Sequence, residues 1–437
     1  MQYEATAYLC GHFTRCCETD VAALTALGWQ REAVDTPTLE HHRRLFYPEF
    51  VDFCYSAADG SDRGSIAFTR QADDRLTIDF KGRTYNYRLS GLTIYLMPLN
   101  MVLFSIGVEM SGNDLNALTA VLFSLRSIDS YRDDVHRDFI SHAIAPLQEV
   151  YRLLTGTEAV RLTQLVENGN KLRTYQVVNC HGETGLSDDG HTRRLYQMAT
   201  LSPVTQPGQH DEYEVAEAYL TRVMERGRLS VFHNWDALAL MDTFTVYLRD
   251  VSEALAANWK DIYFRTIYLH ALFQKCYLFS LNTRFRESLR QSSPSVIGQM
   301  LPLRGGVKGA TLSEEYESFE RWCCFHKISY NFLPLELAAA IDNALEIGEE
   351  QALLHDMLER EKTRRDEAND RMVNTLLFCL SLLTLFSAIW DLSCLLDQLY
   401  PYADYIGDTI SGYRWVTSIV LLLLALLIYV LFRRKRR

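Results

Sequence analysis

Residues 372–396, MVNTLLFCLSLLTLFSAIWDLSCLL, form an apolar stretch of 25 residues with a single charge, Asp391. As a helix this stretch would be about 37 Å long, and the hydrocarbon core of a bilayer is roughly 30 Å thick. A second apolar stretch at residues 415–432, WVTSIVLLLLALLIYVLF, has no charge and would be about 27 Å long as a helix. Five cations at residues 433–437 follow it directly, which disfavours two buried core helices as the alternative. The sequence therefore predicts two transmembrane helices.

The charges beside these two stretches predict their orientation. The connecting residues 397–414 hold three aspartates and one cation, whereas the tail 433–437 is RRKRR and four Lys or Arg residues occur within 362–371. Because Lys and Arg favour the cytoplasmic side, we expect 397–414 to be a short extracytoplasmic loop and 433–437 a basic cytoplasmic tail. The chain would then be a multi-pass protein of the inner (cell) membrane with both termini in the cytoplasm.

The residues before the first span are expected to form two cytosolic domains of mixed α+β class. Residues 1–210 read as an α/β sensor domain. Residues 202–210, with two prolines, set a soft boundary, and 211–371 read as a helical domain. The strands are expected at Glu4–Leu9, Ser65–Thr69, Leu76–Phe80, Thr84–Leu89 and Thr174–Asn179, with a hairpin of Leu92–Met97 and Met101–Val108 around Pro98-Leu99-Asn100.

A long stalk helix is expected to join the second domain to the first span. It would run from about Leu335 without another proline. Within it, ten of the thirteen residues 359–371 are charged, with both signs mixed. A helix that is polar on all sides is stabilised by solvation and by i,i+4 ion pairs. This part is therefore predicted to be a solvated stalk.

Composition disfavours several function classes. The net charge of −11 and the pI of about 5.6 argue against direct binding of nucleic acid, which needs a clustered basic face. The chain has no G-x-S-x-G, H-E-x-x-H, P-loop or dinucleotide motif, so an enzyme is not expected. We expect no covalent cofactor.

Polar residues in the first span are predicted to line a pore. At about 100° per residue, Asn374, Ser381, Thr384 and Asp391 fall within one arc of roughly 100°. Intramembrane carboxylates usually face a cavity or a partner. A ring of Asp391 side chains would concentrate cations at the outer mouth and contact the permeant metal ion. The alternatives are that Asp391 is hydrated at the interface and that Ser381 and Thr384 serve helix packing.

Two apolar residues lie near the same arc. Phe378 and Leu385 could close the path as an apolar gate that excludes water.

The order of these features resembles that of the CorA-type cation channels. A long helix enters the first of two C-terminal spans, and a short outer loop and a basic tail follow. Residues 319–341, FERWCCFHKISYNFLPLELAAAI, and the aromatic residues 263–279 also resemble the helices of that family. The resemblance covers residues 314–437 and more weakly 211–290. It implies a homopentamer with a cytosolic α/β domain and a funnel of long helices, and a divalent cation as the permeant ion.

One departure changes what the resemblance implies. CorA-type channels carry Gly-Met-Asn at the outer end of the first span as their filter for the hydrated cation, whereas this chain reads AIWDLS at residues 388–393. Magnesium selectivity therefore does not carry over.

Some divergent CorA-like proteins accompany type III CRISPR systems and act as membrane effectors in antiviral defence, switched by a nucleotide second messenger. This chain resembles them in its lost filter motif and enlarged cytosolic region. A nucleotide needs aromatic faces for stacking and cations for phosphate, and the candidate cations lie within residues 259–286: Lys260, Arg265, Lys275, Arg284 and Arg286. The alternative for this segment is a packed helix with a cationic outer edge. The alternative for the whole chain is a two-span membrane-anchored sensor or scaffold without a conducting pore.

Overall fold

The computed structural model describes residues 1–16, 21–55, 64–80, 82–157, 171–182, 188–202, 216–291 and 306–399. The chain divides into two units. The first unit holds Met1–Ser293 and Lys308–His355, and the second holds Pro294–Val307 and Asp356–Arg437. The second predicted span, residues 415–432, lies outside the described residues together with residues 400–414 of the outer loop and the basic tail; residues 397–399 of that loop belong to a helix.

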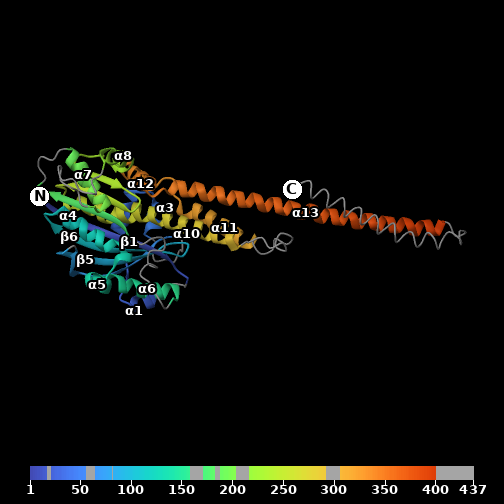
Figure 1. Ribbon diagram of the computed structural model, residues 1–437, viewed down its shortest axis with the longest axis horizontal. Coiled ribbons are helices and arrows are strands. Elements are labelled where there is room, and N and C mark those ends of the chain that lie inside the picture. Colours follow the sequence, from blue (N-terminus) through green and yellow to red (C-terminus); the bar gives the residue numbers. More distant parts are fainter. Residues whose placement is uncertain are drawn as a thin grey trace. The chain divides into compact units, whose positions relative to one another are not determined.

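The first unit contains a sheet of ten strands (Figure 1). Its order is β2-β3-β5-β6-β1-β7-β10-β9-β8, and β4 pairs with β5. All the pairings are antiparallel except that of β7 with β10, which is parallel. The strands are β1 Gln2–Thr14, β2 Gln30–Arg31, β3 Ile66–Arg70, β4 Asp74–Phe80, β5 Arg83–Leu96, β6 Met101–Gly112, β7 Arg173–His181, β8 Arg228–Leu229, β9 Trp235–Ala239 and β10 Thr243–Arg249. A mixed α+β fold is thus confirmed, as are the strands expected before residue 200.

Two strands predicted separately, at 84–89 and 92–97, are one bulged strand, β5. Its pairing with β6 shifts register between Leu89 and Gly91. An extra residue in one strand reverses the alternation of its side chains, so Leu89 before the bulge and Leu92 after it both face the same core. Gly107 lies opposite the bulge, where a Cβ atom would come within 2.5 Å of Ser90 Oγ.

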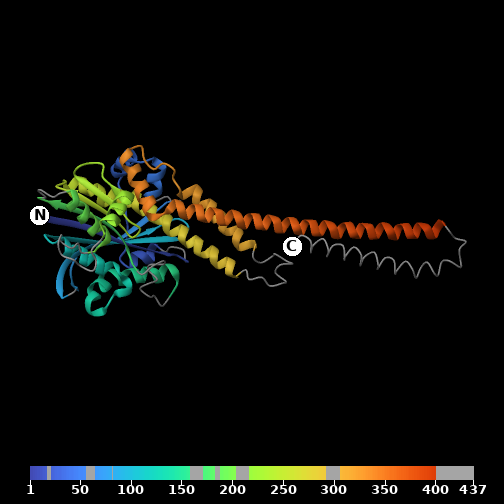
Figure 2. The same ribbon diagram turned by 45° about the horizontal axis from the view of Figure 1, so that its top comes forward.

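Both faces of the sheet are covered by helices (Figure 2). Side chains of a strand point alternately to opposite faces, and in β1 the odd-numbered Ala5, Ala7 and Leu9 join the main hydrophobic core. Helices α4 and α7 pack on that face. On the opposite face the even-numbered Tyr8 stacks on Phe264 of the segment η4, with ring centroids 4.1 Å apart. The central strand therefore supports one purely apolar layer and one aromatic, more polar layer.

The sheet continues beyond the boundary expected near residue 210. Strands β9 and β10 follow that point, and β10 pairs with β7 in the same sheet. Both strands belong to the same compact unit as β1. The expected helical domain at 211–371 thus also contains strands β8, β9 and β10, because periodicity alone does not distinguish short buried strands from helix.

The helices of the described residues follow the strands or join them. They are α1 Val21–Ala26, α2 Thr36–Leu45, α3 Pro48–Cys54, α4 Leu115–Arg126, α5 Asp133–Phe139, α6 Ala145–Thr155, α7 Asp188–Thr200, α8 Glu217–Gly227, α9 Glu253–Ala257, α10 Leu269–Gln291, α11 Gly306–Cys323, α12 Phe332–Leu345 and α13 Ile347–Leu399, with a 3₁₀ turn η1 at Ile128–Ser130 and π-helical segments η2 at Ile140–Ile144 and η4 at Asn258–Tyr268.

The long helix expected from residue 335 is divided in two. Helix α12 ends where Glu346 adopts the left-handed conformation, with φ 55° and ψ 38°, and α13 begins at the next residue. A left-handed residue ends an α-helix because it turns the chain out of the helical path. The stalk is therefore α13 alone, which has 53 residues.

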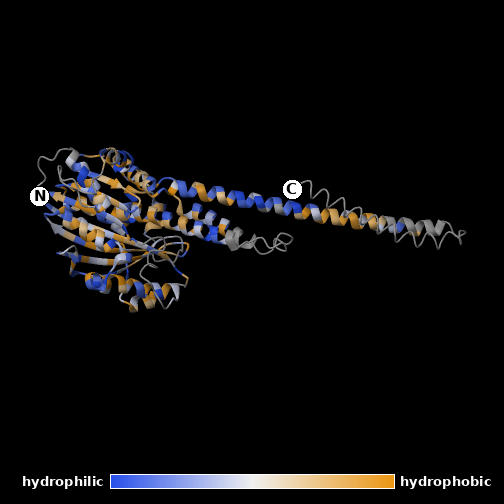
Figure 3. Ribbon diagram, viewed as in Figure 1, coloured by the Kyte–Doolittle hydropathy of each residue, from blue (hydrophilic) through white to orange (hydrophobic). Residues whose placement is uncertain are grey.

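Helix α13 changes from charged to apolar along its length (Figure 3). Two i,i+4 ion pairs lie in its charged part, Asp356–Arg360 at 2.8 Å and Glu367–Arg371 at 3.0 Å, as predicted for the stalk. Among the described residues, one helical stretch, Ile347–Ala388, is long and apolar enough to cross a membrane, and its most apolar part is not buried at all.

A buried carboxylate joins the last three strands of the sheet. Asp236 on β9 is 2% exposed. Its two oxygens accept hydrogen bonds from Arg228 of β8 at 2.9 Å and from Arg249 of β10 at 2.9 Å. Breaking a buried ion pair leaves an uncompensated charge.

We predict that Asp236→Asn lowers the free energy of unfolding by about 3 kcal/mol. Urea unfolding of the detergent-solubilised chain, followed by tryptophan fluorescence, measures it. Asp134→Asn is the matched control, because Asp134 and its partner Arg132 are 72% and 67% exposed, and it should cost less than about 1 kcal/mol. Equal effects of the two variants would contradict a structural role for Asp236.

Candidate functional site

A cavity of about 620 Å³ lies on the aromatic face of the sheet in the first unit. Its walls come from three parts of the chain: the strands β1, β3, β5 and β6, helix α2, and the segment η4. Small-molecule sites in proteins usually have volumes of roughly 300–1,000 Å³. The size and position of this cavity therefore fit a ligand of modest size.

Tyrosine and hydroxyl side chains from the sheet form one wall of the cavity. Tyr8 of β1, Thr93 and Tyr95 of β5, and Ser105 of β6 line it. They occupy strand positions that alternate with the core residues, so they point away from the apolar layer. The Tyr95 hydroxyl lies 3.5 Å from Ser105 Oγ. This wall offers aromatic surface together with hydrogen-bonding groups.

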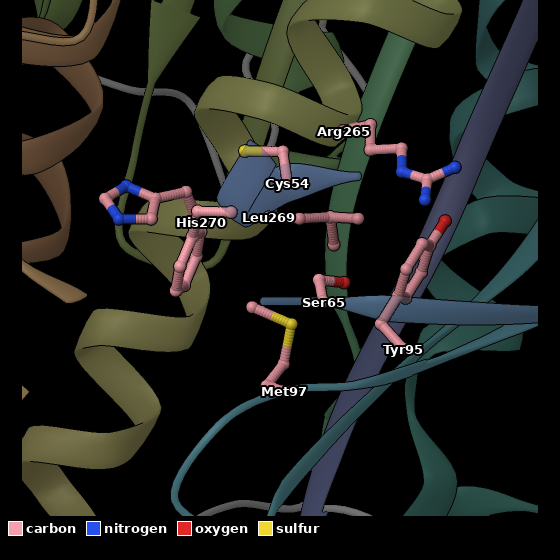
Figure 4. Close-up of a pocket in the computed structure, with 8 residues that line it drawn as sticks. Cys54, Ser65, Tyr95, Met97, Arg265, Leu269 and His270 are labelled. Carbon is pink, nitrogen blue, oxygen red and sulfur yellow. The ribbon is translucent and has the colours of Figure 1, made fainter. Parts of the chain in front are cut away.

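Arg265 of η4 lies where this cavity meets a much smaller one, of about 10 Å³, that Tyr95 also lines (Figure 4). Its guanidinium forms an ion pair with Glu32, which also lines the larger cavity. The guanidinium carbon lies 4.2 Å from the centroid of the Tyr55 ring, a geometry in which a cation is attracted to the ring face. Arg265 is thus held in place by contacts within the protein.

Lys260 and Asp261 bring further charge to the η4 wall. Lys260 Nζ lies 3.3 Å from the Glu253 carboxylate, whose side chain is 79% exposed. Exposed ion pairs of this kind contribute only about 0–1 kcal/mol. Lys260 can therefore exchange Glu253 for an anionic ligand at little cost.

Two adjacent histidines of α2, His41 and His42, complete the cavity. Burial, with smaller contributions from the neighbouring His41 and Arg265, lowers the pKa of His42 to about 4. The His42 ring centroid lies 4.8 Å from that of Tyr55. His42 is therefore neutral at neutral pH and adds an uncharged polar group to the site.

The five cations predicted for a ligand are not brought together. Lys260 and Arg265 line the cavity, but Lys275 is buried and pairs with Glu350 at 3.1 Å. Arg284 pairs with Glu315 at 2.8 Å, and Arg286 is exposed. At ~1.5 Å per residue, Lys275 is about 15 Å further along the helix than Arg265. Of the predicted ligand set, Lys275, Arg284 and Arg286 therefore do not line this cavity.

Most of the cavity was not predicted, because its residues come from distant parts of the sequence. Tyr8, Tyr95 and the histidine pair are separated by strands and helices that only the fold brings side by side. The even positions of β1 carried the one usable signal: in a strand buried on both faces, the polar hydroxyl of Tyr8 falls on the side opposite the core.

The predicted pore residues lie on the apolar part of α13. Asn374, Leu385 and Asp391 are exposed, and Phe378 is partly buried. The hydroxyl of Ser381 donates to the Leu377 carbonyl at 2.8 Å, and that of Thr384 donates to the Ser381 carbonyl at 2.9 Å. Both hydroxyls thus satisfy their donor within the helix and keep their lone pairs as acceptors.

Within the described residues, no group of three or more His, Cys, Asp or Glu side chains could hold a metal ion. The metal contact expected of Asp391 stays a prediction.

The chain matches no protein-family model and no curated protein. The resemblance to CorA-type channels remains a prediction from the residues quoted above.

The smaller cavity contains a buried histidine that makes stability depend on pH. His270 is 7% exposed, and its Nε2 lies 2.9 Å from the Cys323 carbonyl oxygen (Figure 4). Burial lowers its pKa to about 4 and exceeds the opposing effect of the hydrogen bond to Cys323. The usual pKa of about 6.5 applies in the unfolded chain. From pH 6.5 down to 4 only the unfolded chain therefore binds this proton, and stability falls.

We predict that His270→Gln reduces the loss of stability between pH 6.5 and 4.5. The wild-type His270 contributes a slope of about 1.4 kcal/mol per pH unit in this range, and glutamine keeps a donor for Cys323 without titrating. Urea unfolding at a series of pH values measures the slope. His142→Gln, at an exposed histidine, is the control. An unchanged slope in His270→Gln would refute the role of His270.

Proposed function

We propose that the chain forms an oligomeric cation channel of the inner membrane, in which the α+β body controls the opening of the membrane helices. One observation carries this proposal. The same helix, α13, begins within the first unit and further along carries an apolar stretch with no buried residue in its most apolar window and with polar residues along one side. The body and the apolar stretch are therefore parts of one continuous element.

The exposed apolar side chains require a lipid environment or partner helices. Leu376, Leu380 and Leu383 are 56%, 57% and 65% exposed. Each buried leucine side chain contributes roughly 1.5–3 kcal/mol, so their exposure to water would be costly. A bilayer satisfies these residues, and it makes the helix 372–396 a membrane span.

Lipid in turn cannot satisfy the polar side of that helix. Asn374 and Asp391 lie within the predicted arc, and a carboxylate facing hydrocarbon costs several kcal/mol. A ring of copies places the arc around a shared axis, where water and cations contact it. We propose a homopentamer by resemblance to the CorA-type channels, with Phe378 and Leu385 as the gate.

The cavity of the body supports control by a small ligand. Tyr8 and Tyr95 supply aromatic surface for a base, and Lys260 supplies a charge for a phosphate group. These are the groups that a nucleotide second messenger needs. We therefore propose the cavity as the site of the gating ligand, in a non-enzymatic effector of type III CRISPR antiviral defence. The competing function is a membrane-anchored sensor or scaffold, which would have no conductance.

We predict that Asp391→Asn reduces cation flux several-fold without changing the oligomer, because a neutral ring no longer concentrates cations. Flux into reconstituted vesicles and the mass of the solubilised oligomer measure both effects. Asp370→Asn, on the charged part of the same helix, is the matched control and should conduct like the wild type. A conducting wild type with an unaffected Asp391→Asn variant would remove Asp391 from the pore, and a monomeric wild type without flux would favour the anchor.

We predict that Lys260→Met raises the messenger concentration needed for half-maximal flux by roughly tenfold, equivalent to one lost charge-assisted hydrogen bond. Adenylate-type messengers, cyclic and linear, are the probes in the vesicle assay. Arg286→Met is the control, because Arg286 is an exposed cation outside the cavity. A response to none of these nucleotides would refute nucleotide gating, and equal effects of the two variants would refute the cavity as the site.

A further inference from the structure

A buried ion pair joins α10, the helix that continues the cavity-lining segment η4, to the first turn of α13. Lys275 Nζ lies 3.1 Å from the Glu350 carboxylate, and the two side chains are 7% and 21% exposed. A buried ammonium group is costly unless it is paired. Removal of either partner is therefore strongly destabilising, because it leaves the other charge buried and uncompensated. Separation of Lys275 from Glu350 therefore costs more than separation of the exposed pairs of the same unit.

One end of this connection is a wall of the cavity. Lys260 and Arg265 belong to η4, which continues directly into α10, the helix that carries Lys275. The residue that joins the two segments, Leu269, has ordinary helical geometry, with φ −66° and ψ −33°. A displacement of η4 is therefore transmitted along a single helix to Lys275.

The segment η4 has a helical geometry that could convert from π to α. It consists of eleven π-helical residues, whereas π-helices usually occur as single turns and frequently at functional sites. A π turn contains one residue more than an α turn. Conversion of one turn of η4 to α geometry would move every following residue of α10 by one position along the helix and would separate Lys275 from Glu350.

The other end of the connection is a helix that starts at a turn. Glu346 has a positive φ of 55°, and a Cβ atom at Gly348 would meet nothing within 4 Å. Gln351 and His355 make the neighbouring contacts of this part of α13, with Cys324 at 3.3 Å and with the Tyr316 ring at 6.4 Å. Lys275 thus provides an ion-pair contact to the first turn of α13, next to the left-handed turn at Glu346, whose carboxylate lies 3.6 Å from Arg226.

We propose that the Lys275–Glu350 ion pair is a latch that transmits the state of the cavity to α13. This inference rests on the function proposed above, since it describes how the body controls the membrane helix. With the pair intact, α13 is held against α10. When η4 changes its helical register on ligand binding, the pair separates and the first turns of α13 are released.

The test uses the full chain in lipid nanodiscs and reconstituted vesicles, without any added nucleotide. The variants are Lys275→Met, Glu350→Gln and the exchange of both charges, Lys275→Glu with Glu350→Lys. In each single variant we expect the amides of residues 350–355 to exchange hydrogen roughly tenfold faster, and the vesicle flux without ligand to differ from that of the wild type. The charge exchange should restore both quantities toward the wild type, which separates a lost ion pair from general misfolding.

Arg284→Met is the matched control, because Arg284 lies on the same helix but pairs with Glu315 of α11 at 2.8 Å. It should leave the exchange of residues 350–355 unchanged. Unchanged exchange in Lys275→Met would overturn the latch, as would faster exchange without any change of flux in a conducting protein. A wild type that never conducts would instead refute the channel, and the exchange rates would still decide whether Lys275 and Glu350 hold α13 to α10.

Discussion

The first constraint on this molecule is the exposure of apolar side chains along α13. A helix that begins with packed residues, Ile347 at 4% and Leu354 at 1% exposed, carries leucines further along that are more than half exposed. No part of the described chain covers those leucines. Apolar surface of this extent is unfavourable in water. These side chains therefore need apolar contacts from outside the described chain. The charged residues 359–371 separate the two regimes and remain soluble through ion pairs within the helix itself.

In contrast to α13, the central strand of the sheet domain is buried on both faces. In β1 one set of alternate residues fills the apolar core, and the other set faces the helical segment η4. The second face is where tyrosines, hydroxyl groups and charged residues collect around a cavity. A strand buried on two faces thus gives the body a rigid support on one side and a chemically varied surface on the other. The segment η4 that lines the cavity continues into α10, the helix that contacts the start of α13.

Sequence patterns predicted the structural features that depend on neighbouring residues. They failed for features that depend on contacts between residues distant in the sequence. Alternation and the Pro98-Leu99-Asn100 turn located the hairpin of β5 and β6, and the density of charge located the stalk. The bulge at Gly91 was not predicted, because it depends on how Leu89 and Leu92 both reach one core. Strands β9 and β10 were read as helix because a short run such as 243–249, buried at every residue but the last, is not distinguished from a buried helix by its periodicity.

The candidate site illustrates the same limit. Lys260, Arg265 and Lys275 looked equivalent as cations in one aromatic helix. Only the fold shows that the first two face a cavity and the third faces Glu350. Helical phase could not separate them, because each partner comes from a segment far away in the sequence.

The charges within the cavity differ in how readily they can respond to a ligand. Arg265 already has Glu32 as its ion partner and Tyr55 beneath its guanidinium, with only 11% of its side chain exposed. An anion that recruited Arg265 would have to separate a largely desolvated pair, which is expensive. Lys260 has a partner that water can replace, because the Glu253 side chain is mostly exposed. Lys260 is therefore the group to meet a phosphate, whereas Arg265 fixes the shape of the wall. A ligand therefore gains binding energy from Lys260 without having to separate the Arg265–Glu32 ion pair.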